Sequence, residues 1–168
     1  MKFSGSRSFQ FSTFNKTESM VGTLNGEGIE HLLKHQLLGH IGCHANNVTY
    51  IVPICYAYDG NCVYGRTFEG MKIKMIRENP KVCFQVEHLE SMAKWQSVIC
   101  WGEFEELTDL DKRNKGIEIL QSRVVGAMGD KNLQISRHWP FSSSELNSLT
   151  GIIFCIHLSE KTGRFENS

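Results

Sequence analysis

The sequence predicts a mainly antiparallel β-barrel with flanking helices. Short runs of β-branched and aromatic residues recur along the chain, and the residues between them are those that form tight hairpin turns. Only a few helical segments lie between these runs, so the pattern lacks the regular strand–helix alternation of a parallel α/β sheet. The 168 residues suffice for one domain with a sizeable core.

Composition and charge narrow the class of protein. Lys and Arg total 18, as do Asp and Glu, and a formal net charge of zero argues against a nucleic-acid binder that works by bulk electrostatics. No apolar run approaches the roughly 20 residues that span a bilayer. Residues 1–22 lack the continuous apolar core of a secretory signal, so we expect an arm or tail over 1–22 and one domain over 23–168.

The cysteines indicate a reducing compartment. None belongs to a C-x-x-C pair, and each falls within a predicted strand, as buried thiols of cytoplasmic proteins do. They are Cys43, Cys55, Cys62, Cys83, Cys100 and Cys155. We therefore expect a cytoplasmic protein without a disulfide framework.

In the first half of the domain, the sequence predicts one helix and three strands connected by hairpins. Asn25 and Gly26 form a cap region, and Gly39 is expected to end the helix that follows. The elements are a helix over residues 27–38 and strands over residues 40–46, 49–58 and 61–67. Pro53 cannot donate to a β-ladder, so it must lie at an edge, at a bulge or where the backbone faces a ligand.

The second half predicts two helices, three strands and a long loop. Thr108 and Asp111 form a capping box before the second of these helices. The elements are a helix over residues 69–79, strands over 81–88 and 95–107, a helix over 109–126, a loop over 126–149 and a final strand over 150–165. A loop of this length is often functional.

The segment from Tyr64 to Pro80 carries the clearest sign of a ligand site. It predicts the end of a strand, a glycine-containing turn at Gly70 and a short basic helix. A helix N-terminus offers unpaired N–H groups and partial positive charge, to which Thr67 adds a hydroxyl and Lys72 an ammonium group. This pattern favours a phosphate site; the alternative is a surface helix whose lysines, Lys72 and Lys74, face water.

Histidines and cysteines do not form a recognisable metal motif. His35, His40 and His44 lie close together with Cys43, but in a strand His40 and His44 share one face while Cys43 points to the other. No second cluster supplies further ligands, so no metal site is predicted. The nucleophile-elbow, dinucleotide-binding and P-loop motifs are missing as well, so an enzymatic reaction would rely on a cofactor.

One strand face is suited to a flat ligand. Trp95, Ser97, Ile99 and Trp101 alternate onto one face of the strand over residues 95–107. Bulky aromatic side chains beside a hydroxyl can pack along the aromatic ring system of a bound ligand. The alternative is that these aromatic side chains pack in the core or in a dimer interface.

Three ordered motifs resemble a known superfamily. They are V-P-I-x-Y-x-Y-D-G from Val52, Y-G-x-T-x-E-G-x-K followed by N-P-x-V from Tyr64, and W-x-S-V-x-x-x-G-x-x-E-x-L from Trp95. In this order they resemble the FMN-binding split-barrel superfamily, that of pyridoxamine 5′-phosphate oxidase-like and nitroimidazole-resistance proteins. The likeness runs from about Ile29 to Leu107 and, more weakly, through the last strand.

This resemblance implies a six-stranded antiparallel split barrel of Greek-key order, paired as a homodimer with FMN at two symmetric interfaces. FAD, haem or a deazaflavin are the alternatives that some relatives use. The implied contacts are Ile51, Val52, Pro53 and Ile54 along the isoalloxazine ring, Arg66, Thr67 and Lys72 at the phosphate, and Ser97 as a polar flavin contact.

The chain departs from the pyridoxamine phosphate oxidases at two places. Met71 stands where they carry the Arg of an Arg-Lys pair, and their C-terminal Arg-containing motif has no counterpart after Ser159. Oxidation of pyridoxamine phosphate is therefore not expected, and the nitroimidazole-resistance branch is the nearer likeness.

The resulting functional expectation is an FMN-binding oxidoreductase that transfers electrons from NADH or NADPH to a small acceptor such as a nitroaromatic. The alternative is a non-catalytic flavin- or haem-binding storage or sensor protein. His44, Arg137 and Trp139 are the predicted acceptor-pocket residues; the alternative for Trp139 is that it plugs one end of the barrel. Neither nucleic acid nor a membrane is an expected partner.

Overall fold

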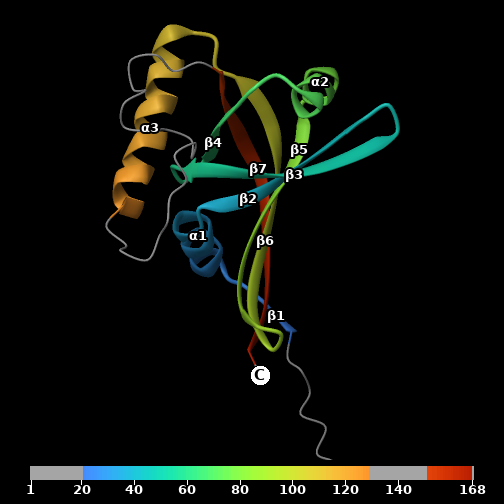
Figure 1. Ribbon diagram of the computed structural model, residues 1–168. Helices are drawn as coiled ribbons and strands as arrows, with labels where there is room; N and C mark the ends of the chain where they lie inside the picture. Colours follow the sequence, from blue (N-terminus) through green and yellow to red (C-terminus); the bar gives the residue numbers. More distant parts are fainter. Residues whose placement is uncertain (1–20, 129–150, 168) are drawn as a thin grey trace, which may run out of the picture.

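Six antiparallel strands close into a barrel in the computed structural model, which describes residues 21–128 and 151–167 (Figure 1). The barrel strands are β2 (Leu38–Ala45), β3 (Val48–Tyr58), β4 (Cys62–Thr67), β5 (Lys81–Ser91), β6 (Lys94–Glu106) and β7 (Ile152–Asn167), and a seventh described strand, β1 (Val21–Thr23), lies outside the ring. The helices are α1 (Gly26–His35), α2 (Met71–Glu78) and α3 (Leu110–Met128). The predicted mainly antiparallel barrel is confirmed.

The ring runs β7–β4–β3–β2–β5–β6 and closes by the pairing of β6 with β7. The non-consecutive neighbours β2–β5 and β4–β7 give it the predicted Greek-key order. β1 is an addition that the sequence analysis did not predict, because three residues are too few to show a period. It pairs with the end of β7 through Val21↔Glu166, whereas residues 1–20 of the expected arm lie outside the described residues.

Alternating side chains separate the barrel core from its outer face. The inward positions are fully or almost fully buried, and burying an aliphatic or aromatic side chain contributes roughly 1.5–3 kcal/mol. They include Ile41, Val63, Phe84, Val86, Val98, Cys100, Phe154 and Ile156. The rings of Phe104 and Phe154 stack at 4.8 Å between centroids. Ile29, Leu32 and Leu33 of α1 complete this core.

A second, smaller core lies under α3, which runs along one side of the barrel (Figure 1). Its buried members are Ala57, Cys62, Tyr64, Leu107, Leu120, Ile153 and Cys155. Gly116 permits the close approach of the helix, since a Cβ at this position would lie 2.9 Å from Leu107. None of the described helices has the length and hydropathy needed to cross a bilayer.

Two predicted boundaries were wrong. The first helix ends at His35 and not at residue 38, because Leu38 already pairs with Cys55 across β2 and β3. Gly39 consequently lies inside β2, where a Cβ would come within 2.4 Å of the Phe84 ring. At α3 the cap is Asp109, whose Oδ1 accepts the Lys112 N–H at 3.0 Å, instead of the predicted Thr108.

The predicted hairpin turns and the first helix cap are confirmed. Asn46 and Asn47 have φ values of 51° and 60°, the left-handed conformation that a two-residue turn requires. Asn25 Oδ1 accepts the Gly28 N–H at 2.8 Å at the start of α1. The β5–β6 strands continue further than predicted, to Ser91 and Lys94, because the polar stretch between them forms a projecting hairpin tip.

Candidate functional site

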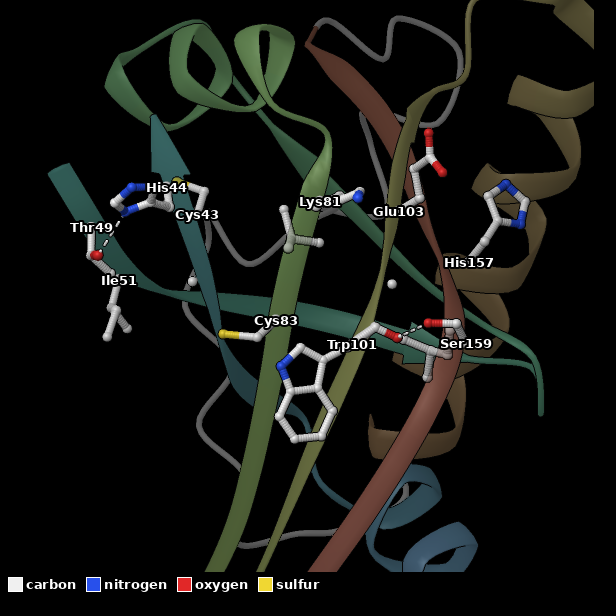
Figure 2. Close-up of a pocket in the computed structure, with 14 residues that line it drawn as sticks. Cys43, His44, Thr49, Ile51, Lys81, Cys83, Trp101, Glu103, His157 and Ser159 are labelled. Atoms are coloured by element: carbon white, nitrogen blue, oxygen red, sulfur yellow. Dashed lines mark hydrogen bonds between the residues drawn. The ribbon is translucent and has the colours of Figure 1, made fainter. Parts of the chain in front are cut away.

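A groove of about 710 Å³ lies on the outer face of the barrel, across β2, β3, β5, β6 and β7 (Figure 2). Its floor is apolar and exposed: Ile51 is 64% accessible and Trp101 is 42% accessible. Cys83 and Trp101 are direct partners on β5 and β6. Exposed apolar side chains that share one groove mark a surface for a flat apolar ligand or for another protein.

Polar side chains surround this floor (Figure 2). His44 Nδ1 and Thr49 Oγ1 lie 3.0 Å apart across the β2–β3 hairpin. Lys81 and Glu103 are register partners on β5 and β6, and Ser159 Oγ donates to the Trp101 carbonyl at 3.1 Å. Of the three predicted acceptor-pocket residues, His44 thus lies in the groove, whereas Arg137 and Trp139 lie outside the described residues.

The predicted ring-lining segment forms an open strand edge. In the part of the chain that the structure describes, β3 pairs with β4 only through Tyr56–Tyr58, so Ile51–Ile54 have a neighbouring strand, β2, on one side alone. An open edge leaves backbone N–H and C=O groups free to bind a ligand, and it explains why Pro53 is tolerated there. Ile51 and Pro53 are exposed and Val52 is half-buried, but Ile54 points into the core and can offer only its backbone.

The predicted phosphate residues lie on either side of the start of α2 along the chain. Arg66 and Thr67 are the last two residues of β4, and Lys72 lies in the first turn of the helix. The N-cap, Gly70, is extended, no side chain of the described residues caps the helix, and no acidic residue lies in its first turn. Its first N–H groups are therefore available to an anion.

Lys72 differs from the other cations around it. Burial lowers the pKa of its ammonium group, and the neighbouring Cys43 opposes this shift. Within the described residues no carboxylate lies at ion-pair distance from Lys72, whereas Lys74 is exposed. A half-buried cation at an uncapped helix start is the arrangement that an anionic group would stabilise.

Ser97 lies apart from the groove. Ser97 shares one face of β6 with Trp95, Ile99 and Trp101, as predicted. The structure shows that this face points outward, since the intervening Val98 and Cys100 are fully buried. Ser97 Oγ accepts from Gln85 Nε2 at 3.3 Å, and Ser97 lines a smaller pocket of about 250 Å³ near the β5–β6 tip. The structure brings Ser97 onto the same sheet face as Trp101 but into a different pocket.

Sequence reasoning missed Lys81, Cys83, Glu103 and Ser159 of the groove. Alternation could have placed Lys81 and Cys83 on the outer face, because they alternate with the apolar Val82 and Phe84 along the strand. Only the barrel closure brings β7, and hence Ser159, beside β6.

Known proteins share both the sequence pattern and the fold. Residues 26–164 match the family model described as pyridoxamine 5′-phosphate oxidase. An uncharacterized protein of Rhizobium meliloti (strain 1021), RA0666, is 40% identical over 76% of this chain and 83% of its own length.

Solved structures extend this likeness. A FAD-binding protein from Mesorhizobium loti superposes with a TM-score of 0.67 at 28% identity, covering 89% of this chain and 99% of that one. A candidate 5-nitroimidazole antibiotic resistance protein from Bacteroides thetaiotaomicron shares the fold with a TM-score of 0.65 at 17% identity, covering 88% of each chain. A FAD and heme binding protein from Mycobacterium smegmatis shares it with a TM-score of 0.64 at 16% identity, over 88% of this chain and 74% of that one. The chain belongs to the pyridoxamine 5′-phosphate oxidase family.

Proposed function

We propose that this protein is a flavin-binding oxidoreductase, with FMN as its cofactor, that transfers electrons from NADH or NADPH to a small acceptor. The observation that carries the proposal is the half-buried Lys72 in the first turn of an uncapped helix, which begins four residues after Thr67 and five after Arg66. The 28% identical FAD-binding protein supports a flavin in general.

The residues present fit a flavin mononucleotide. Lys72, the Arg66 guanidinium, the Thr67 hydroxyl and the N–H groups of α2 would hold the phosphate. The open edge of β3 at Ile51–Ile54 would supply backbone hydrogen bonds to the ring system, and Ser97 would add a polar contact. When bound, the flavin supplies the hydride and electron chemistry that the protein's own side chains do not.

A second copy of the chain would complete the site. Ile51, Ile99 and Trp101 are large apolar side chains exposed on one outer face of the sheet. A partner packed on this face would bury them and exclude water from the flavin, so we propose a homodimer. We also propose that it works in the cytoplasm: all six cysteines lie in the described residues, and none forms a disulfide.

The acceptor would bind over the groove, where His44 and Thr49 form one polar edge. Arg137 and Trp139 belong to the segment before β7, and our proposal assigns them to the same pocket as a cation and an aromatic wall. We propose a nitroaromatic as the acceptor, because the Bacteroides thetaiotaomicron protein that shares the fold is described as a candidate 5-nitroimidazole antibiotic resistance protein.

The test is the spectrum and the reducibility of the purified full-length protein. Flavin bands that bleach under anaerobic NADH or NADPH, and return on addition of a nitroaromatic, would support the oxidoreductase. Bands that persist with every donor would leave a binding or storage module, and a Soret band would identify haem. Failure to bind FMN or FAD after reconstitution would refute the proposal.

A further inference from the structure

We propose a second site, a Zn²⁺ centre formed by Glu105, Cys155 and His157. These residues lie on β6 and β7 beside the N-terminal part of α3, near Lys112 and Lys115. His157 also lines the groove, but the inference does not depend on the proposed flavin function. The sequence analysis predicted no metal site, because Glu105 is some 50 positions away from the other two residues and no ligand spacing is visible.

The β-ladder holds the three residues together. Glu105 and Cys155 are direct register partners between β6 and β7, and His157 follows two residues later on the same strand as Cys155. On the other side of β7, Cys62 of β4 is the register partner of His157. Because three paired strands fix these backbone positions, the cluster needs no loop to assemble.

The ligand atoms converge on one point. His157 Nε2 lies 2.7 Å from Glu105 Oε2 and 3.3 Å from Cys155 Sγ, and Cys155 Sγ lies 3.8 Å from the same carboxylate oxygen. Zinc bond lengths of about 2.0–2.3 Å at a tetrahedral angle require ligand–ligand separations of roughly 3.4–3.6 Å. Two of the three distances are within a few tenths of an ångström of this range. The third is a hydrogen bond, which would lengthen when the metal replaces the shared proton.

The position of Cys155 differs from that of the thiol in a catalytic triad. In a Cys-His-carboxylate relay the thiol and the carboxylate occupy opposite ring nitrogens. Here Cys155 Sγ and Glu105 Oε2 face the same nitrogen, Nε2. Convergence on one atom is the property of a coordination site, in which Nε2, Sγ and Oε2 each donate to one ion.

The neighbouring groups are those that metal ligands commonly have. Cys62 Sγ lies 3.3 Å from His157 Nδ1, so it can accept a hydrogen bond from the N–H that Nδ1 must carry when Nε2 binds a metal. Lys112 Nζ donates to the other carboxylate oxygen, Glu105 Oε1, at 2.6 Å, so Oε2 can bind the metal. Both the imidazole and the carboxylate are thus oriented by a second contact.

The composition of the site favours zinc. Thiolate and imidazole ligands suit Zn²⁺ better than Mg²⁺ or Ca²⁺, and one thiolate with one carboxylate neutralises a divalent ion. The Cys155 proton leaves to solvent on binding. A cavity of about 170 Å³ lined by Tyr64, Leu107 and Lys115 adjoins the cluster and leaves room for water as a fourth ligand.

The experiment is a titration of the full-length, metal-stripped protein with Co²⁺, followed by Zn²⁺. Difference spectra against the metal-free sample remove any flavin contribution. We expect one Co²⁺ per chain, with a thiolate-to-cobalt charge-transfer band and visible bands of four-coordinate cobalt. Zn²⁺ should displace the Co²⁺, since it binds such ligand sets more tightly.

Variants identify the ligands. His157→Ala and Glu105→Gln change partly exposed side chains and should weaken binding by at least about tenfold, and Cys155→Ala should abolish the charge-transfer band. Cys62→Ala should keep the band and weaken binding by about 10- to 100-fold. His88→Ala and Cys83→Ala, which lie outside the cluster, should bind as wild type does. Absence of the band in the wild type, or equal affinity in wild type and His157→Ala, would overturn the proposal.

Discussion

Two lysines on α2, two positions apart, meet different surroundings. Lys72 is half-buried beside β2, and burial lowers the pKa of its ammonium group, whereas Lys74 is exposed. An anion bound at Lys72 would remove the free-energy cost of its burial, but one near Lys74 would compete with water and salt.

We therefore expect Lys72→Ala to weaken flavin binding by roughly ten- to a hundredfold, the value of one charge-assisted hydrogen bond of about 1.5–3 kcal/mol. Fluorescence titration of the apoprotein with FMN measures this affinity. Lys74→Ala is the matched control and should change it little. Equal losses in both variants would leave only a basic helix face in place of a specific contact.

At the scale of an element, the β3–β4 hairpin depends on one carboxylate. Asp59 Oδ1 accepts the N–H groups of Asn61 and Cys62 at 2.9 and 2.8 Å, and Oδ2 accepts the Tyr64 hydroxyl at 3.1 Å. Burial raises the pKa of Asp59, but these hydrogen bonds outweigh burial, and the net pKa is below the usual value. Gly60, with φ of 109°, supplies the left-handed turn position.

Asp59→Ala should lower the free energy of unfolding by roughly 1–2 kcal/mol at neutral pH. We expect a loss near the lower end of this range, because solvent screens the charge of this exposed carboxylate. The folded pKa lies below the unfolded one, so the stabilisation is present above the usual Asp range and is lost as pH falls through the folded pKa. Urea unfolding from pH 7 to pH 3 should show the two proteins converging. Asp111→Ala, an exposed acid on α3, is the control, and a pH-independent difference would contradict the charge-based account.

At the scale of the whole molecule, a single chain leaves large apolar side chains on one outer face of the barrel exposed to solvent. Ile51 of β3 and Ile99 and Trp101 of β6 are 64%, 39% and 42% accessible on the outer face of the barrel, with β2 and β5 between the two strands. An obligate dimer typically buries more than about 2,000 Å² in total and places such side chains at its centre.

We expect sedimentation of the wild-type protein to show a dimer. In Ile99→Lys the equilibrium should shift toward the monomer, and the amount of bound flavin should fall with it. Burying an unpaired ammonium group in an apolar interface is strongly unfavourable. Leu110→Lys, at an exposed position on α3, is the matched control and should leave the dimer intact. A wild-type monomer that retains stoichiometric flavin would refute this assembly.

The sequence by itself determined the barrel class, most strand positions and the faces of the strands, because the two-residue period and the turn chemistry are local. The shared face of Ser97 and Trp101, the Asn46-Asn47 turn and the cap at Asn25 all follow from neighbours within a few positions. Local patterns also placed Lys72 in the first turn of α2, next to Arg66 and Thr67.

Only the tertiary structure decided where α1 stops, how the ring closes and which distant residues meet. Leu37 and Leu38 continue the helical period, but Leu38 gains a ladder partner in Cys55, and strand pairing prevails. The groove unites Ile51, Trp101 and Ser159, and the proposed metal site unites Glu105, Cys155 and His157, because β7 pairs with β6 across the barrel. Pairing between segments some 50 positions apart depends on how the barrel closes and leaves no local period in the sequence.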